Sequence, residues 1–105
     1  MSESSGNLIR YQVVYSEYVR NEMKKLIARA KERGLDGQVR AAVTEMDRVL
    51  HVFPQFGDPL VDLSFVPGQI RIVTVAPLVV RYALYEEQRL VIVSRPIMSQ
   101  PHSGL

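Results

Sequence analysis

The stretch PLVVRYALYEEQRLVIVSRP, residues 77–96, decides the fold of this chain. Two runs rich in β-branched and aromatic residues flank the charged segment YEEQ, a pattern that predicts a β-hairpin. Because side chains alternate between the two faces of a strand, Val80, Tyr82 and Leu84 share one face, which predicts a core face. Arg81 then lies on the opposite face of the same strand.

The register of this hairpin depends on the length of its turn. The turn lacks the Asn-Gly signal of a two-residue loop, so the sequence leaves that length open. An odd-numbered loop would place Arg89 and Arg95 on the same face as Arg81. An even-numbered loop would place Arg81 with Leu90 and Ile92.

Ahead of the hairpin, the chain predicts a strand followed by two helices. YQVVY, residues 11–15, predicts the strand, and Ser16 is placed to cap a helix that Gly34 ends. A second apolar stripe begins at Val39 and predicts a second helix, which Pro54 stops. Two further strands are predicted at 60–66 and 69–76.

This order predicts an α+β domain: an N-terminal strand, an αα-hairpin, and then a mostly antiparallel four-strand run, with the helices packed on one sheet face. A single domain is expected at residues 9–98, with flexible ends at 1–8 and 99–105. The other face of the sheet is then uncovered, and we call it the open face.

Composition narrows the classes of function. The 105 residues suit one domain, and the absence of cysteine excludes disulfides, a thiol nucleophile and cysteine-ligated metal. Two separated histidines predict neither a metal site nor a metal cofactor. No apolar run is long enough to span a bilayer and the N-terminus lacks an apolar signal region, so we expect a cytoplasmic protein without membrane contact.

Two arginines of the predicted sheet are expected to converge. If Ile70 and Ile72 belong to the core, Arg71 is forced onto the open face, where Arg81 of the neighbouring strand also lies. No carboxylate shares their strand faces, and phosphate is the anion that best matches the guanidinium fork. The alternative, that each arginine is simply a solvated residue on an exposed strand, remains open.

The whole pattern resembles the RelE/ParE toxin superfamily of bacterial type II toxin–antitoxin systems. YQVVYS resembles the family's first strand, FGDPLVDL the segment after its second helix, QIRI its basic strand and VVRYALYEEQRLVIV its last hairpin. The likeness covers residues 9–96. It implies a cognate antitoxin as partner, and one of two activities. RelE-like members cleave mRNA on the ribosome without a metal, and ParE-like members inhibit DNA gyrase without chemistry.

The resemblance also implies site residues. Arg71 matches the second lysine of the family's basic strand, and Gln69 stands at the first. Val79 replaces a family arginine, for which Arg81 is the substitute that we expect. The catalytic candidates are Arg71, Arg81, Arg95 and Tyr85, with His102 as another possible base; the RNA-binding candidates are Gln69, Arg89, Lys24 and Lys25.

Three functions are therefore compatible with the sequence. The first is a ribosome-dependent mRNA endonuclease that needs no cofactor, in which basic groups stabilise the charged transition state and a further group takes the proton of the 2′-OH. The second is a gyrase inhibitor. The third is a non-toxic binding module that retains the fold. An uncovered sheet or helix face is also a candidate homodimer surface.

Overall fold

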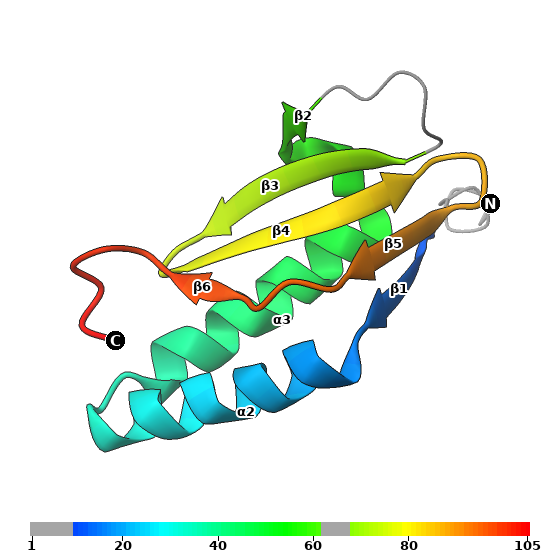
Figure 1. Ribbon diagram of the computed structural model, residues 1–105. Helices are drawn as coiled ribbons and strands as arrows, with labels where there is room; N and C mark the ends of the chain where they lie inside the picture. Colours follow the sequence, from blue (N-terminus) through cyan, green and yellow to red (C-terminus); the bar gives the residue numbers. More distant parts are fainter. Residues whose placement is uncertain (1–9, 62–67) are drawn as a thin grey trace, which may run out of the picture.

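The computed structural model describes residues 10–61 and 68–105, and shows a sheet with two helices on one of its faces (Figure 1). In chain order the elements are β1 (Gln12–Tyr15), α2 (Glu17–Glu32), α3 (Asp36–Val52), the 3-10 turn η1 (Pro54–Phe56), β2 (Asp58–Val61), β3 (Gln69–Val75), β4 (Leu78–Tyr85), β5 (Leu90–Val93) and β6 (Met98–Ser99). None of the described helices is both long and apolar enough to cross a membrane.

The sheet has the strand order β1-β5-β4-β3-β2, and β6 also pairs with β4. β1 runs parallel to β5, whereas the other pairs are antiparallel. These features confirm the predicted α+β class with an N-terminal strand, a helical hairpin and a mostly antiparallel run of strands. The strand predicted at 60–66 begins earlier, as β2, and its residues 62–66 lie outside the described part of the chain.

The helix ends follow the local sequence. The Ser16 hydroxyl accepts a hydrogen bond from the backbone N–H of Val19 at 3.1 Å, which is the predicted N-cap of α2. Gly34 has a φ of 71°, a conformation that side chains with a Cβ rarely adopt, and it follows the last turn of α2. α3 ends at Val52, two residues before Pro54, as the sequence predicts.

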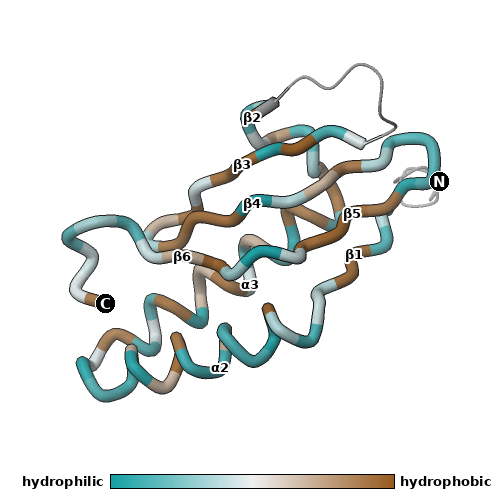
Figure 2. The backbone as a smooth tube through the Cα atoms, viewed as in Figure 1, coloured by the Kyte–Doolittle hydropathy of each residue, from teal (hydrophilic) through white to brown (hydrophobic). Residues whose placement is uncertain are grey.

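One hydrophobic core lies between the helices and the sheet. From β4, the predicted core residues Val80, Tyr82 and Leu84 are 1%, 2% and 0% exposed. Met46 and Leu50 of α3 are completely buried opposite the sheet. Figure 2 shows hydrophobic positions concentrated along β4 and β5, while α2 alternates short hydrophobic stretches with hydrophilic ones. This separation is typical of a helix that covers a sheet with one side only.

The face assignment predicted for β3 was wrong. Arg71 pairs in register with Tyr82, and Ile72 pairs with Arg81. Arg71 therefore lies on the helix-covered face, where Val73 is buried, and Ile72 lies on the open face. The reason is that β3 carries apolar residues on both of its faces, so alternation alone does not identify the core side. Pairing with β4 identifies it.

The hairpin between β4 and β5 has an even-numbered loop. Tyr85 pairs with Leu90, so the four residues 86–89 connect the strands. Of the two alternatives left by the sequence, this is the one that places Arg81 on the same face as Leu90 and Ile92. Arg89 belongs to the turn itself, with a φ of 51°.

The C-terminal tail is held against the rest of the molecule, where the sequence predicts a flexible end at 99–105. The N–H of Gln100 donates to the carbonyl of Pro77 at 2.8 Å, and the Arg33 guanidinium donates to the carbonyl of Gly104 at 2.7 Å. Leu105 packs against the core. These contacts connect the tail to the start of β4 and the end of α2. Residues 1–8 lie outside the described part of the chain.

Candidate functional site

The open face of the sheet carries two exposed arginines close together. Arg81 projects from the middle of β4, and Arg95 follows the end of β5. Both residues line the same two adjoining hollows, of about 230 and 250 Å³. They therefore stand where the two hollows meet. Within residues 10–61 and 68–105, no acidic side chain forms an ion pair with either arginine.

The walls of the two hollows are mainly apolar. Ile70, Ala83 and Ile92 line one of them, and Ile72 and Val79 line the other. Paired guanidinium groups bind phosphate oxygens well because each presents a planar fork of N–H donors. The aliphatic side chains on both sides can contact the uncharged parts of such a ligand. The arrangement can thus hold a phosphodiester with a flexible chain on either side.

Arg71 does not belong to this site, which corrects the prediction that it joins Arg81. Its side chain is half-buried on the helix-covered face, and its Nη1 donates to the carbonyls of Gln55, at 3.1 Å, and Gly57. Its Nε donates to the Gln69 side chain at 3.2 Å. Through these hydrogen bonds, Arg71 connects the segment after α3 to the start of β3. We infer a structural role for Arg71 and for Gln69, which lies beside it.

The other predicted residues lie in three further places. Tyr85 is on the open face, but four residues from Arg81, or about 13 Å along an extended strand. Arg89 is exposed in the β4–β5 turn. Lys24 and Lys25 lie on α2, on the other side of the sheet, and Lys25 forms an ion pair with Glu22 at 3.2 Å. At the open-face hollows, the structure therefore brings together only Arg81 and Arg95 from the predicted set.

His102 is exposed in the C-terminal tail and has a φ of 64°. It does not line either hollow of the open face. Within the part of the chain that the structure describes, no cluster of histidine, aspartate and glutamate is suited to hold a metal ion.

A polar network that the sequence did not predict joins three segments at one end of the sheet. The Tyr11 hydroxyl donates to Glu86 at 2.8 Å, and Gln55 donates to the oxygens of both residues, at 2.6 to 3.1 Å. Burial, followed by the hydrogen bond to Glu86, raises the pKa of Tyr11. The network connects the chain before β1, the turn η1 and the β4–β5 turn. It is a long-range arrangement with no local sequence signal.

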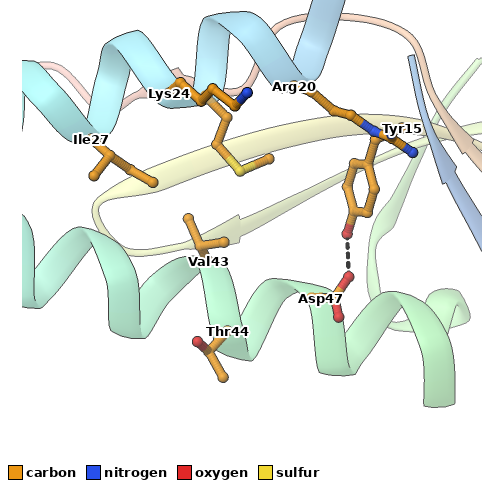
Figure 3. A pocket seen from close by; sticks show the side chains of 8 residues that line it. Tyr15, Arg20, Lys24, Ile27, Val43, Thr44 and Asp47 are labelled. Carbon is orange, nitrogen blue, oxygen red and sulfur yellow. Dashed lines mark hydrogen bonds between the residues drawn. The ribbon is translucent and has the colours of Figure 1, made fainter. Parts of the chain in front are cut away.

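Another hollow, separate from the two on the open face, lies between the two helices (Figure 3), and the sequence did not predict it. We call it the interhelical groove; it measures about 470 Å³. It is lined by Tyr15, Arg20, Met23, Lys24, Ile27, Val43, Thr44 and Asp47. The apolar residues among them belong to the helical stripes, and only the packing of α2 against α3 reveals that they remain partly uncovered.

One end of the groove is closed by a hydrogen bond. The Tyr15 hydroxyl donates to the Asp47 carboxylate at 2.5 Å (Figure 3). The His51 imidazole lies one helical turn further along α3, with Nδ1 3.4 Å from the other carboxylate oxygen and 2.8 Å from the backbone carbonyl of Asp47. Burial, followed by the bond to Asp47, raises the pKa of Tyr15. The phenol therefore stays protonated and acts as a donor.

Comparisons of the chain with protein-family models, with curated proteins and with solved structures returned no match.

Proposed function

We propose that this chain is a RelE/ParE-type toxin of a type II toxin–antitoxin system, which cleaves mRNA on the ribosome without a metal. The observation that carries the proposal is that Arg81 and Arg95 both line two hollows of the open face, and that neither forms an ion pair with a described acidic side chain. The order of strands and helices, and the uncovered sheet face, are compatible with the likeness over residues 9–96.

The proposed chemistry is an in-line displacement at one phosphate. The 2′-hydroxyl oxygen of the RNA attacks the adjacent phosphorus and gives its proton to water, and the bond from phosphorus to the 5′-oxygen of the next nucleotide breaks. The leaving 5′-oxygen takes a proton from water, so the products are a 2′,3′-cyclic phosphate and a free 5′-hydroxyl. Arg81 and Arg95 stabilise the negative charge that builds up on the phosphate oxygens. Tyr85 lies about 13 Å further along β4 and lines neither hollow, so the proposal gives it no role. In this proposal the rate enhancement comes from charge stabilisation and alignment.

ParE-like inhibition of DNA gyrase is the second candidate. It is favoured by the position of Arg71, which faces the helices and donates to backbone carbonyls, so the open face has one cation fewer than expected. In both cases the proposal includes a cytoplasmic location and a cognate antitoxin as partner. A non-toxic binding module is the outcome if expression of the chain does no harm.

The test is induced expression in bacteria, with cell growth and the positions of mRNA 5′ ends as readouts. We expect growth arrest with new 5′ ends at codons held in the ribosomal A site. An Arg81→Gln/Arg95→Gln variant is expected to lose both effects. The matched control, Arg29→Gln/Arg40→Gln, removes the same charge from exposed helix positions and should retain both.

Three results would count against mRNA cleavage. Growth arrest that persists in the Arg81→Gln/Arg95→Gln variant would remove the site from the proposal. Accumulated cleaved DNA–gyrase complexes with intact mRNA would select the second candidate. Unimpaired growth with the wild-type chain would select the non-toxic module.

A further inference from the structure

The interhelical groove has an aliphatic floor. Met23, Ile27 and Val43 are half-buried there, and its volume of about 470 Å³ falls in the range of small-molecule sites. The polar groups of α3 at the groove are already engaged: the Thr44 hydroxyl donates to the carbonyl of Arg40 at 3.0 Å, and Asp47 accepts from Tyr15. A floor without free hydrogen-bonding groups favours an alkyl body over a heterocycle, and the flexible thioether of methionine adapts to such a chain.

The charges around the groove are segregated. Arg20 and Lys24 are spaced i,i+4 on α2, so they lie on the same side of that helix. Figure 3 shows both on the α2 side, with Asp47 across the groove on α3 and bonded to Tyr15. Within the described residues, neither cation forms an ion pair. The groove therefore has a cationic rim above an apolar floor, which complements an amphiphile with a negative head.

We propose that the interhelical groove binds the anion of a free medium-chain fatty acid. The carboxylate contacts Arg20 and Lys24, and the alkyl chain lies over Met23, Ile27 and Val43, directed away from Asp47. From Arg20 to Ile27 the axis of α2 rises about 10 Å, at 1.5 Å per residue, which favours a medium-length chain. The groove lies on the helix layer and the arginine pair on the opposite sheet face, so this inference does not depend on the proposed function.

The test uses methionine methyl groups as reporters. The chain has four methionines, of which Met23 lies in the groove, Met46 is completely buried and Met98 is 64% exposed. In protein labelled with ¹³C at the methionine methyl, decanoate below its micellar concentration should shift the Met23 signal saturably and leave Met98 unchanged. A Met23→Leu variant assigns the signal. Decyltrimethylammonium should bind at least tenfold more weakly, because its head has the wrong charge for the rim.

Two double variants distinguish direct contacts between the rim and the carboxylate from a nonspecific effect of the charge of the protein. Arg20→Gln/Lys24→Gln removes the proposed contacts to the carboxylate and should weaken decanoate binding about fivefold to tenfold, as expected for two solvent-exposed ion pairs. Lys25→Gln/Arg29→Gln removes the same charge from exposed positions of α2 outside the groove and should keep the affinity within about twofold. Thermal unfolding of both variants checks that each remains folded.

The proposal is overturned if decanoate produces no saturable Met23 shift up to millimolar concentration. It is also overturned if decyltrimethylammonium binds as tightly as decanoate, if both double variants weaken binding equally, or if the shifts occur at Met98 instead. The last result would indicate association with the open face.

Discussion

Replacing Arg71 by methionine should test whether this arginine is structural. Methionine keeps an apolar stem but removes the guanidinium, so the carbonyls of Gln55 and Gly57 lose their donor. A hydrogen bond from a charged donor contributes about 1.5–3 kcal/mol. Because the side chain is only half-buried, water replaces part of the loss, and we expect unfolding to become about 2 kcal/mol easier for the two bonds together.

Urea unfolding followed by circular dichroism measures this change. A loss of about 2 kcal/mol lowers the midpoint by roughly 1 M at the m-values of small domains, and lowers Tm by about 8–16 °C. Arg81→Met is the matched control on the next strand, and as an exposed position it should change stability by at most about 0.5 kcal/mol. If Arg71→Met unfolds at the same urea concentration as the wild-type chain, Arg71 has no structural role. If that variant is as stable as the wild-type chain but no longer toxic, Arg71 belongs to the active site.

Three further predictions concern stability. Ser16→Ala removes the N-cap of α2 and should lower the free energy of unfolding by about 1 kcal/mol, measured by urea unfolding. An unchanged free energy would mean that another group caps the helix. Gly34→Ala requires a residue with a Cβ to adopt a φ of 71°, and should lower the free energy of unfolding by about 1 kcal/mol in the same assay. The pKa of Tyr15 is raised by folding, so its contribution is complete below the unfolded value of about 10 and is lost as pH rises beyond it. Tyr15→Phe should therefore flatten the fall in stability between about pH 10 and 11.5, measured by urea unfolding at each pH; a slope equal to that of the wild-type chain would contradict this.

The parts of the fold that the sequence predicts correctly are those that local patterns determine. β4 alternates strictly between buried and less buried positions, so its core face was evident from Val80, Tyr82 and Leu84. Ser16 and Gly34 marked the two ends of α2 because capping and positive φ are local requirements. Such signals require no knowledge of which segments meet in space.

The parts that were wrong or missed depend on long-range pairing. β3 has apolar residues on both faces, so only its register with β4 shows that Arg71 faces the helices. β6 has two residues, and only its pairing with Val79 and the residue before it defines it as a strand. The interhelical groove depends on how α2 packs against α3, because Met23 and Val43 match the pattern of ordinary core residues.

The number of cations on the open face decides how strongly this face can attract RNA. The register of β3 turns Arg71 toward the helices, and Arg89 belongs to a four-residue turn. Of the four arginines in residues 70–105, this leaves Arg81 and Arg95 at the open-face hollows. For single-stranded RNA, each neutralised phosphate adds about −0.7 to the slope of log K against log salt concentration. Two arginines thus correspond to a slope of about −1.4, and four to about −2.8. So small an electrostatic contribution gives only weak binding to free RNA. An RNA-directed activity of this face therefore needs a second surface that aligns the strand. The proposed cleavage of mRNA on the ribosome, which follows from the likeness to RelE-type toxins, would provide that surface.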